Sequence, residues 1–467
     1  MQAVKQVLVL GAGKSSPYLI AQLLELASEH DWFVTVGDID IENARQCVDG
    51  HDRGTAVSFD VNDANLRSTS IEQSDVVVNM LSPVFQDLVA WDCVAHGRHM
   101  LSVSYDDEAV RDLSPDAQRN GVLLLTDLGL DPGIDHMSAM QILRRVHDDG
   151  GRVHSFRSYG SGIPAPEGPL NPLRYVVSWN PRNVVMSAEH GAQYMQDGKI
   201  KIVPYHHVFH HTWAVDVPGV GVLEAYPNRD SLSYMQAFGL DDVRTMIRAT
   251  LRYPGWCETW AQIVRLGLPN ETLRIPDLAN RTYAEVVEMH LPLSHTEAPL
   301  EQRIANFLQI SPTGSIMENL RWLGLLSNEP TGCPGETASA MLIDLMSRKL
   351  PLEPGQQDMV VLVHELEVDY PDLDRPSETI TSTMVERGEP GGFTAMARTV
   401  GLPTAVAVKL LLEGGIPLTG SQIPTHPSIY QPVLRELAKA GITFTEKVVK
   451  HGDEVRPARE PSVEPGQ

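Results

Sequence analysis

The stretch GAGKSS at positions 11–16 has the residue types and spacing of a dinucleotide-binding turn. It follows the apolar run VKQVLVL and precedes the helix-like run SPYLIAQLLELASE. In such a turn the first glycine allows a tight bend and the second lets the backbone approach a pyrophosphate, while the helix N-terminus supplies amide donors. Gly11 and Gly13 therefore predict a dinucleotide site. Ser16 replaces the usual third glycine, and the alternative is a glycine turn without a ligand.

An acidic residue, Asp38, ends the second strand-like run, FVTVGD. A carboxylate at this place accepts hydrogen bonds from the ribose hydroxyls of NAD and repels the extra phosphate of NADP. This predicts NAD as the cofactor, with NADP disfavoured. The alternative role for Asp38 is to cap the helix that begins at Ile41.

Three polar residues follow two later strands. Ser104 and Tyr105 come after HMLSVS, and Asp131 comes shortly after VLLLTDL. Ligands of open parallel sheets lie beyond the carboxyl ends of the strands, so these side chains should face the reacting groups. Tyr105 could relay a proton or bind an amine, and Asp131 could hold an ammonium or iminium. A packed tyrosine and a turn-forming aspartate are the alternatives.

Two arginines could bind carboxylates. They are Arg229 in EAYPNRDSL and Arg252 in IRATLRYPGW, and guanidinium groups bind carboxylates in bidentate fashion. Most arginines are solvated or paired at the surface, so their spacing alone leaves this role open.

We expect no metal site. The stretch YHHVFHH offers His206, His207, His210 and His211, but no carboxylate or cysteine at ligand spacing accompanies them. The 4 cysteines are scattered and show no CxxC pair.

The pattern of runs predicts two domains. From residue 4 to Leu128, β-branched runs alternate with amphipathic ones, which predicts an α/β fold with a doubly wound parallel sheet, the Rossmann fold. The turn-rich stretch GLDPGID (129–135) predicts a domain boundary followed by a helix. Residues 150–390 mix strand-like and helix-like runs, with RTMIRATLRY (244–253) among the helix-like ones, and predict a mixed α+β domain. The apolar run 394–415 predicts a helix interrupted at 401–403.

Composition excludes several classes of partner. The 467 residues are 42% hydrophobic and 21% charged, as in soluble globular proteins. The formal net charge of -23 disfavours nucleic acid and anionic membranes as partners. No apolar run reaches the roughly 18 residues needed to span a bilayer, and no signal pattern opens the sequence. We therefore expect a cytoplasmic protein.

Several long blocks resemble one known family. They are GLDPGIDHMSAM (129–140), GSGIPAPEGPLNPLRYVVSW (160–179), EAYPNRDS (224–231), IRATLRYPGW (247–256) and GGFTAMARTVGLPTAVAVKLLLEG (391–414). Together they resemble the glutamate-forming saccharopine dehydrogenases, also called saccharopine reductases. The likeness runs across nearly the whole chain.

The resemblance implies a fold and an activity. A Rossmann domain would comprise residues 1–130 plus 393–450, and a mixed α+β substrate domain would comprise 131–392 with a helical insertion at about 228–330. The composition of residues 452–467 predicts a disordered tail. The implied reaction is the NAD(P)-dependent interconversion of saccharopine with glutamate and 2-aminoadipate 6-semialdehyde through an imine, in lysine metabolism. Alternatives are a lysine 6-dehydrogenase, a carboxynorspermidine-type dehydrogenase, or a non-catalytic NAD-binding regulator.

The resemblance also implies the site residues. The cofactor contacts would be Gly11, Gly13, Lys14, Ser15, Asp38, Asp60, Val61, Leu81, Ser82, Leu130 and Trp179. The substrate contacts would be Ser104, Tyr105, Asp131, Arg229, Thr250 and Arg252, with Tyr105 and Asp131 as the catalytic pair. Fungal relatives have a serine- or arginine-containing turn at the Asp38 position, which supports NAD here, and a cysteine at the Gly160 position. We expect small amino acids as substrates and a homodimer as the assembly.

Overall fold

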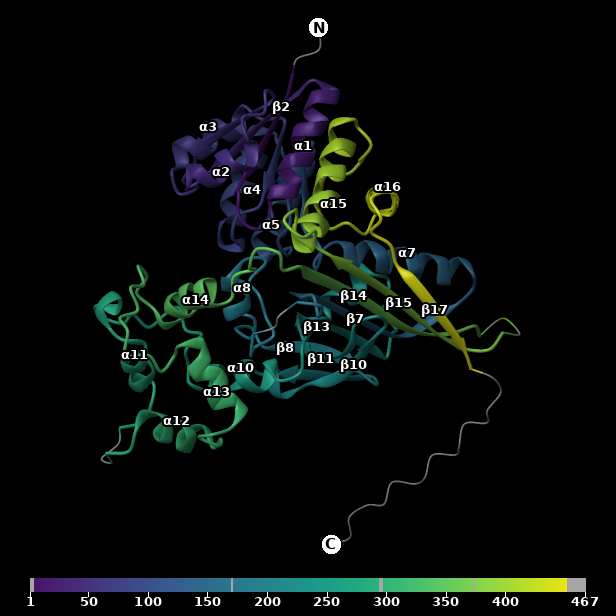
Figure 1. The fold of residues 1–467 in the computed structure, drawn as a ribbon. Coiled ribbons are helices and arrows are strands. Elements are labelled where there is room, and N and C mark those ends of the chain that lie inside the picture. The colour runs from purple at the N-terminus through teal and green to yellow at the C-terminus, as the bar shows by residue number, and fades with distance from the viewer. Residues whose placement is uncertain (1–3, 169–170, 294–296, 372, 374, 452–467) are drawn as a thin grey trace.

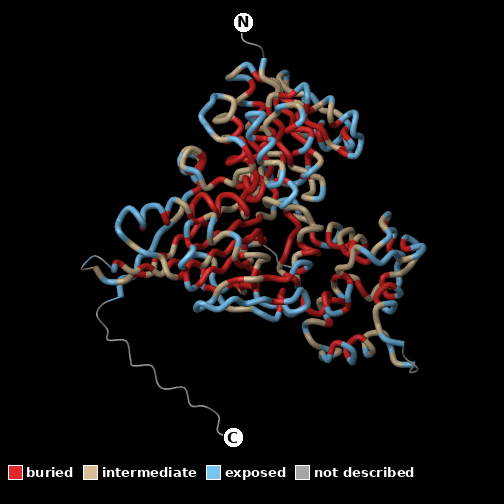
Figure 2. Tube along the Cα trace, turned by 180° about the vertical axis from the view of Figure 1, so that it is seen from behind, coloured by how far each residue is buried: buried red, intermediate tan, exposed pale blue. Residues whose placement is uncertain are grey.

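Two β-sheets organise the chain into two domains, and a group of helices extends from the second one (Figure 1). The computed structural model describes residues 4–168, 171–293, 297–371, 373 and 375–451. The predicted disordered tail, residues 452–467, lies outside these described residues. Buried residues fill the interior of both domains, and the outer turns and helix faces are exposed (Figure 2).

Within the described chain, seven parallel strands form the first sheet, in the order β16-β6-β5-β4-β1-β2-β3. The order reverses direction at β1, as in a Rossmann fold, so the predicted α/β fold with a doubly wound sheet is confirmed. β4 is buried on both faces, which explains its unbroken run of valines. The strands are β1 (Lys5–Leu10), β2 (Trp32–Asp38), β3 (Gly54–Ser58), β4 (Val76–Asn79), β5 (His99–Ser102), β6 (Leu123–Leu125) and β16 (Gly420–Gln422).

Helices cover this sheet on both faces. They are α1 (Pro17–His30), α2 (Ile41–Val48), α3 (Ala64–Glu72), the short 3-10 turn η1 (Pro83–Phe85), α4 (Gln86–His96), α5 (Glu108–Asp112) and α6 (Ser114–Arg119).

Only part of the C-terminal segment 393–450, which was expected to complete the Rossmann domain, belongs to the first domain, because its last strand, β17 (Thr445–Lys450), pairs with β15 (Glu378–Arg387) in the second sheet. Helix α15 (Ala395–Leu412) lies along α1 (Figure 1). Strand β16 adds to the edge of the first sheet beside β6. A Cβ at Gly401 would lie 2.6 Å from the backbone nitrogen of Leu19, so only glycine permits this close packing. Helix α16 (Pro427–Lys439) packs against α15.

Helix α15 differs from the sequence expectation in two ways. It runs without a break through Pro403, and next to this proline the hydroxyl of Thr404 donates to the carbonyls of Val400 and Leu128. Its 18 residues are also long and apolar enough to cross a membrane, contrary to the expectation that no run reaches that length. Because 67% of them are buried within the structure, α15 has the character of a core helix.

Ten strands make up the second sheet within the described residues. Its main path is β10-β11-β13-β7-β14-β15-β17, with β7 and β13 parallel at its centre. The strands are β7 (Arg152–Pro164), β8 (Ala192–Gln196), β9 (Lys199–Val203), β10 (Trp213–Val217), β11 (Gly221–Pro227), β12 (Arg229–Asp230), β13 (Thr245–Arg252), β14 (Asp358–Asp369), β15 (Glu378–Arg387) and β17 (Thr445–Lys450). Helix α7 (Ile134–Asp148) packs on β7 and β14. The expected helix over 244–253 is wrong, because β13 is a central strand buried on both faces, where apolar periodicity does not distinguish strand from helix.

The helical insertion lies later in the chain than expected, between Trp256 and Lys349. Its elements are α10 (Trp256–Arg265), the 3-10 turn η3 (Leu278–Asn280), α11 (Tyr283–Met289), α12 (Leu300–Leu308), α13 (Ser315–Leu323) and α14 (Ala338–Lys349). The remaining short helices of the second domain are α8 (Pro181–Val185), the 3-10 turn η2 (Tyr205–His210) and α9 (Ser233–Ala237).

Candidate active site

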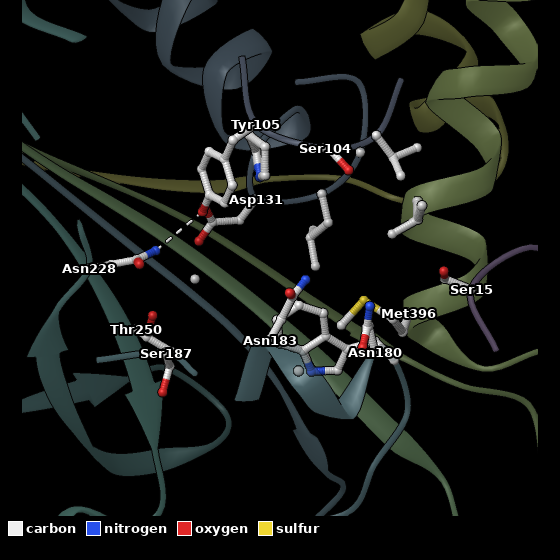
Figure 3. A pocket seen from close by; sticks show the side chains of 18 of the residues that line it. Ser15, Ser104, Tyr105, Asp131, Asn180, Asn183, Ser187, Asn228, Thr250 and Met396 are labelled. Carbon is white, nitrogen blue, oxygen red and sulfur yellow. Dashed lines mark hydrogen bonds between the residues drawn. The ribbon is translucent and has the colours of Figure 1, made fainter. Parts of the chain in front are cut away.

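A cavity lies between the two domains, beyond the carboxyl ends of β1, β4 and β5. Tyr105, Asp131 and Asn228 gather at one end of it, and Ser15 and Met396 lie at the other (Figure 3). Most of the predicted contact residues line it, namely Ser15, Leu81, Ser104, Tyr105, Leu130, Asp131, Trp179, Arg229, Thr250 and Arg252. The first domain, the second domain and α15 therefore share one site.

The end of the cavity near Ser15 fits a dinucleotide. Gly11 has φ +102°, and a Cβ there would lie 3.1 Å from the backbone of Met80, so the turn requires glycine. Nothing lies within 4 Å of a Cβ position on Gly13, which leaves the backbone open to a pyrophosphate. The hydroxyls of Ser16 and Ser82, beside this turn and at the end of β4, are buried and have no hydrogen-bond partner among the described residues.

Lys14 and Asp38 are both engaged by the protein. Nζ of Lys14 donates to the carbonyl of Val177 at 3.1 Å, which ties the glycine turn to the second domain. The carboxylate of Asp38 accepts from the backbone nitrogens of Ala12 at 2.7 Å and Asp40 at 2.9 Å. Asp40, and not Asp38, caps α2. Asp38 thus holds the turn in place through hydrogen bonds of its own.

The other predicted cofactor residues stand at strand ends outside the cavity lining. Asp60 and Val61 follow β3, where Asp60 accepts from the backbone nitrogen of Asn62 at 2.9 Å and Val61 is buried. Ser82 follows β4 and begins η1.

Tyr105 and Asp131 meet at the opposite end of the cavity. The Tyr105 hydroxyl donates to Oδ1 of Asp131 at 3.3 Å, and Nδ2 of Asn228 donates to the Tyr105 oxygen at 3.4 Å (Figure 3). Burial, followed by the negative charge of Asp131, raises the pKa of Tyr105, so the phenol keeps its proton at neutral pH. Burial and then the charge of Asp135 raise the pKa of Asp131 above its usual range. This pair can therefore hold or release a proton close to neutral pH at Asp131.

Two arginines in the lining have no carboxylate partner among the described residues. Arg252 is 4% exposed, and its guanidinium lies 5.0 Å from the ring centre of Tyr175 and 5.7 Å from that of Trp256. Its Nε makes no hydrogen bond in this part of the structure. Arg229 lies 5.1 Å from the ring centre of Tyr105. A buried, unpaired cation is costly, so this arrangement fits a ligand that brings carboxylates.

A third arginine, Arg248, was not singled out from the sequence. One of its nitrogens bonds Oδ1 of Asp131 at 2.6 Å and Oδ2 of Asp135 at 2.9 Å. Behind it, His136 lies between Asp135 and Asp127. The sequence signal that could have found this group is the density of ionisable residues in an otherwise apolar stretch, DLGLDPGIDH (127–136).

A Rossmann sheet with an open glycine turn, joined to a second domain that supplies an acid and arginines, defines a two-domain nicotinamide-dependent oxidoreductase. Two family models match the chain, the saccharopine dehydrogenase NADP binding domain over residues 7–125 and the saccharopine dehydrogenase C-terminal domain over residues 129–442. The chain belongs to the saccharopine dehydrogenase family.

Named relatives agree with this assignment. The chain is 31% identical to the Pyricularia oryzae protein named saccharopine dehydrogenase [NADP(+), L-glutamate-forming], over 96% of this chain and 100% of that protein. It is 34% identical to bovine mitochondrial alpha-aminoadipic semialdehyde synthase over 95% of this chain, but spans only 48% of that protein. Apo saccharopine dehydrogenase from Saccharomyces cerevisiae has a similar structure, with a TM-score of 0.81 and 30% identity over 95% of this chain and 100% of that one. The predicted family is confirmed.

The predicted preference for NAD is wrong. The matching family model is that of an NADP binding domain, and the Pyricularia oryzae, Schizosaccharomyces pombe and Saccharomyces cerevisiae relatives are named for NADP(+). The physical reason lies in Asp38, whose carboxylate serves the backbone nitrogens of Ala12 and Asp40. These hydrogen bonds account for an acidic residue at this position without any contact to the ribose.

Proposed function

We propose that the protein catalyses the NADP(H)-dependent interconversion of saccharopine with glutamate and 2-aminoadipate 6-semialdehyde. The observation that carries this proposal is the pair of arginines, Arg229 and Arg252, that line one cavity with Asp131 and have no carboxylate partner among the described residues. Saccharopine has one secondary amine, which can pair with Asp131, and several carboxylates, which can pair with Arg229 and Arg252. The names of the relatives support the same reaction.

Each side chain then has a defined task. When bound, the nicotinamide supplies or accepts the hydride. Arg229 and Arg252 bind carboxylates of the substrate and thereby fix the reacting carbon. Oδ2 of Asp131 accepts a hydrogen bond from the cationic nitrogen, while the Tyr105 hydroxyl stays on Oδ1. Gly11, Gly13, Ser16 and Ser82 would hold the pyrophosphate.

Three further properties remain part of the proposal. We propose that the substrates are small amino acids, that the protein acts in the cytoplasm and that it forms a homodimer. The net charge of -23 supports small molecules as partners, because such a charge repels nucleic acid and anionic membranes.

The test is a spectrophotometric assay of NADPH oxidation. We expect turnover when glutamate and 2-aminoadipate 6-semialdehyde are supplied together and none with either alone. Saccharopine should reduce NADP(+) in the reverse direction, and NADPH should be used better than NADH. Turnover with lysine in place of saccharopine would favour a lysine 6-dehydrogenase, and absence of any turnover with retained NADPH binding would favour a regulator.

A further inference from the structure

A charge chain of five side chains with alternating sign runs from the cavity into the interior of the second domain. Its members are Asp131, Arg248, Asp135, His136 and Asp127. Arg248 bonds Asp131 at 2.6 Å and Asp135 at 2.9 Å through one nitrogen. Nδ1 of His136 lies 3.2 Å from Oδ2 of Asp135, and Nε2 of His136 lies 3.0 Å from Oδ2 of Asp127. The order of the groups is therefore acid, base, acid, base, acid.

Only the first member of this chain lines the cavity. Asp131 is among the lining residues, whereas Arg248, Asp135, His136 and Asp127 are not. The side chains of these four are at most 4% exposed. Salts and water cannot screen charges at such depth, so each group acts strongly on its neighbours.

The two acids that lie behind Arg248 in the charge chain, Asp135 and Asp127, accept hydrogen bonds from fixed donors. Oδ1 of Asp127 accepts from the backbone nitrogen of Asp106 at 2.5 Å, and its Oδ2 also accepts from the hydroxyl of Tyr234 at 3.2 Å. The backbone nitrogen of Gly133 donates to Oδ1 of Asp135 at 2.6 Å. These donors fix the positions of the carboxylates of Asp127 and Asp135.

The near end leaves one oxygen of Asp131 free. Its Oδ1 accepts from Arg248 and from Tyr105, and its Oδ2 has no hydrogen bond among the described residues. Oδ2 lies against Gly160, a lining residue. The charge chain therefore presents a single free oxygen, Oδ2 of Asp131, to the place where the substrate nitrogen would sit.

We propose that Arg248, Asp135, His136 and Asp127 are positioning residues that orient Asp131 and set the charge it presents to the reacting nitrogen. The inference rests on the proposed function in one respect, since that function makes the amine of saccharopine the group that Asp131 meets. With all five groups ionised the chain holds one excess negative charge, and a cationic amine neutralises it.

The protonation of His136 supports this view. Burial alone would lower the pKa of His136, but Asp135 and Asp127 outweigh it and raise that pKa to about 9. The histidine is therefore charged at neutral pH, and its positive charge acts with Arg248 to lower the pKa of Asp131 against the effects of burial and Asp135.

Other ionisable groups also face this chain. Tyr105 and Arg229 act on it from the cavity side, and Tyr234 from α9. His364 on β14 lies behind it and donates or accepts at the hydroxyl of Ser138 at 2.8 Å. Burial lowers the pKa of His364 to about 4, so it contributes no charge at neutral pH.

Two substitutions at residues that do not line the cavity should move the pH profile in opposite directions. His136→Gln removes a positive charge, so the acid limb of kcat/KM for saccharopine oxidation should move to higher pH by about 0.5–1 unit. Asp127→Asn removes a negative charge, so the same limb should move to lower pH. Both variants keep a hydrogen-bonding side chain of similar size.

A matched control is His364→Gln. It replaces a neutral buried histidine beside the same cluster, and its pH profile should match that of the wild type. A purely structural role predicts lower kcat with an unmoved limb, or shifts of the same sign in all variants, and either result would overturn the proposal.

A binding measurement covers the case of a poorly folding variant. Arg248→Lys keeps the charge, but its shorter side chain lacks the planar guanidinium that places one nitrogen between Asp131 and Asp135. We expect kcat to fall at least 10-fold while the Kd for NADPH stays within twofold of the wild type. Unchanged kcat would contradict the positioning role, whereas a wild-type enzyme that ignores saccharopine would instead contradict the proposed function.

Discussion

The guanidinium of Arg252 lies among aromatic rings with no carboxylate beside it in the described structure. We expect Arg252→Met to raise the KM for saccharopine 10- to 100-fold, because each charge-assisted contact contributes about 1.5–3 kcal/mol. Arg252→Lys should recover little of this loss, since an ammonium cannot reproduce a bidentate pair. Steady-state kinetics of saccharopine oxidation would measure the effect.

Arg157 supplies the control for this prediction. It lies on β7, pairs with Glu367 at 3.1 Å and does not line the cavity. Arg157→Met should leave the KM for saccharopine near its wild-type value. Equal KM values in the two variants would remove Arg252 from the substrate site.

Gly160 gives Asp131 its space. A Cβ at this position would collide with Oδ2 of Asp131 and lie 3.1 Å from its Cγ. We expect Gly160→Ala to displace the carboxylate and lower kcat by at least 10-fold, because near-neutral proton transfer depends on its placement. Stopped-flow measurement of NADP(+) reduction would isolate this step.

Gly162, two residues along the same strand, is the comparison. A Cβ there would collide with the flexible end of Met396 and make an ordinary contact with Oγ of Ser178, so Gly162→Ala should cost less activity than Gly160→Ala. A larger loss in Gly162→Ala would show that space at Asp131 is not the deciding factor.

Some residues of the cavity can be located from the sequence and others cannot. The placement of Tyr105, Asp131 and Arg252 in one cavity could be predicted, because they follow strands or lie in blocks that resemble a family. Arg248 could not, since its partner Asp131 is 117 residues away in the chain. The prediction that Asp38 contacts the ribose fails because the sequence does not show that its carboxylate already accepts a hydrogen bond from the backbone nitrogen of Ala12.

At the scale of elements, helix α7 and strand β14 each bury a histidine, and the two differ in charge. Burial alone would lower the pKa of His136, but the charges of Asp135 and Asp127 outweigh it and raise this pKa to about 9. At His364 burial prevails and lowers the pKa to about 4. An unfolded histidine titrates near 6.5. The stability from His136 is therefore complete below pH 6.5 and is lost as the pH rises through 9. His364 destabilises the fold as the pH falls from 6.5 toward 4.

We accordingly expect the free energy of unfolding to fall by about 3 kcal/mol between pH 6.5 and 9. Urea denaturation at several pH values would measure this. His136→Gln should flatten the alkaline slope, and His364→Gln should flatten the acid slope instead. An alkaline slope that survives in His136→Gln would contradict the assignment of this proton.

Elements of the first sheet could be predicted with more success than those of the second. Parallel strands buried on both faces are continuous apolar runs, and turn residues separate them. β13 is also buried on both faces, so its apolar pattern does not distinguish a strand from a helix. Only its pairing with β7 and β11 decides the matter.

At the scale of the whole molecule, the first domain depends on the end of the chain. Strand β16 forms an edge of its sheet, and α15 covers α1. We expect a chain that ends at Gly392 to lose NADPH binding, although every residue of the glycine turn is present. Fluorescence titration with NADPH would test this.

A chain that ends at His451 is the control, since it keeps every described helix and strand. It should bind NADPH as the full chain does. Wild-type affinity in the chain that ends at Gly392 would show that α15 and β16 are dispensable for the cofactor site.

The return of the C-terminal segment also bears on how the protein is made. Synthesis of strand β6 ends at Leu125, whereas synthesis of its neighbour β16 begins only at Gly420. At usual rates of translation this delay is about 15–60 s, so the first domain to be synthesised is completed only after most of the second domain. During that interval the uncovered face of α1 and the open edge of β6 are exposed to other nascent chains. We expect folding in the cell to rely on chaperones that hold the N-terminal domain until translation ends.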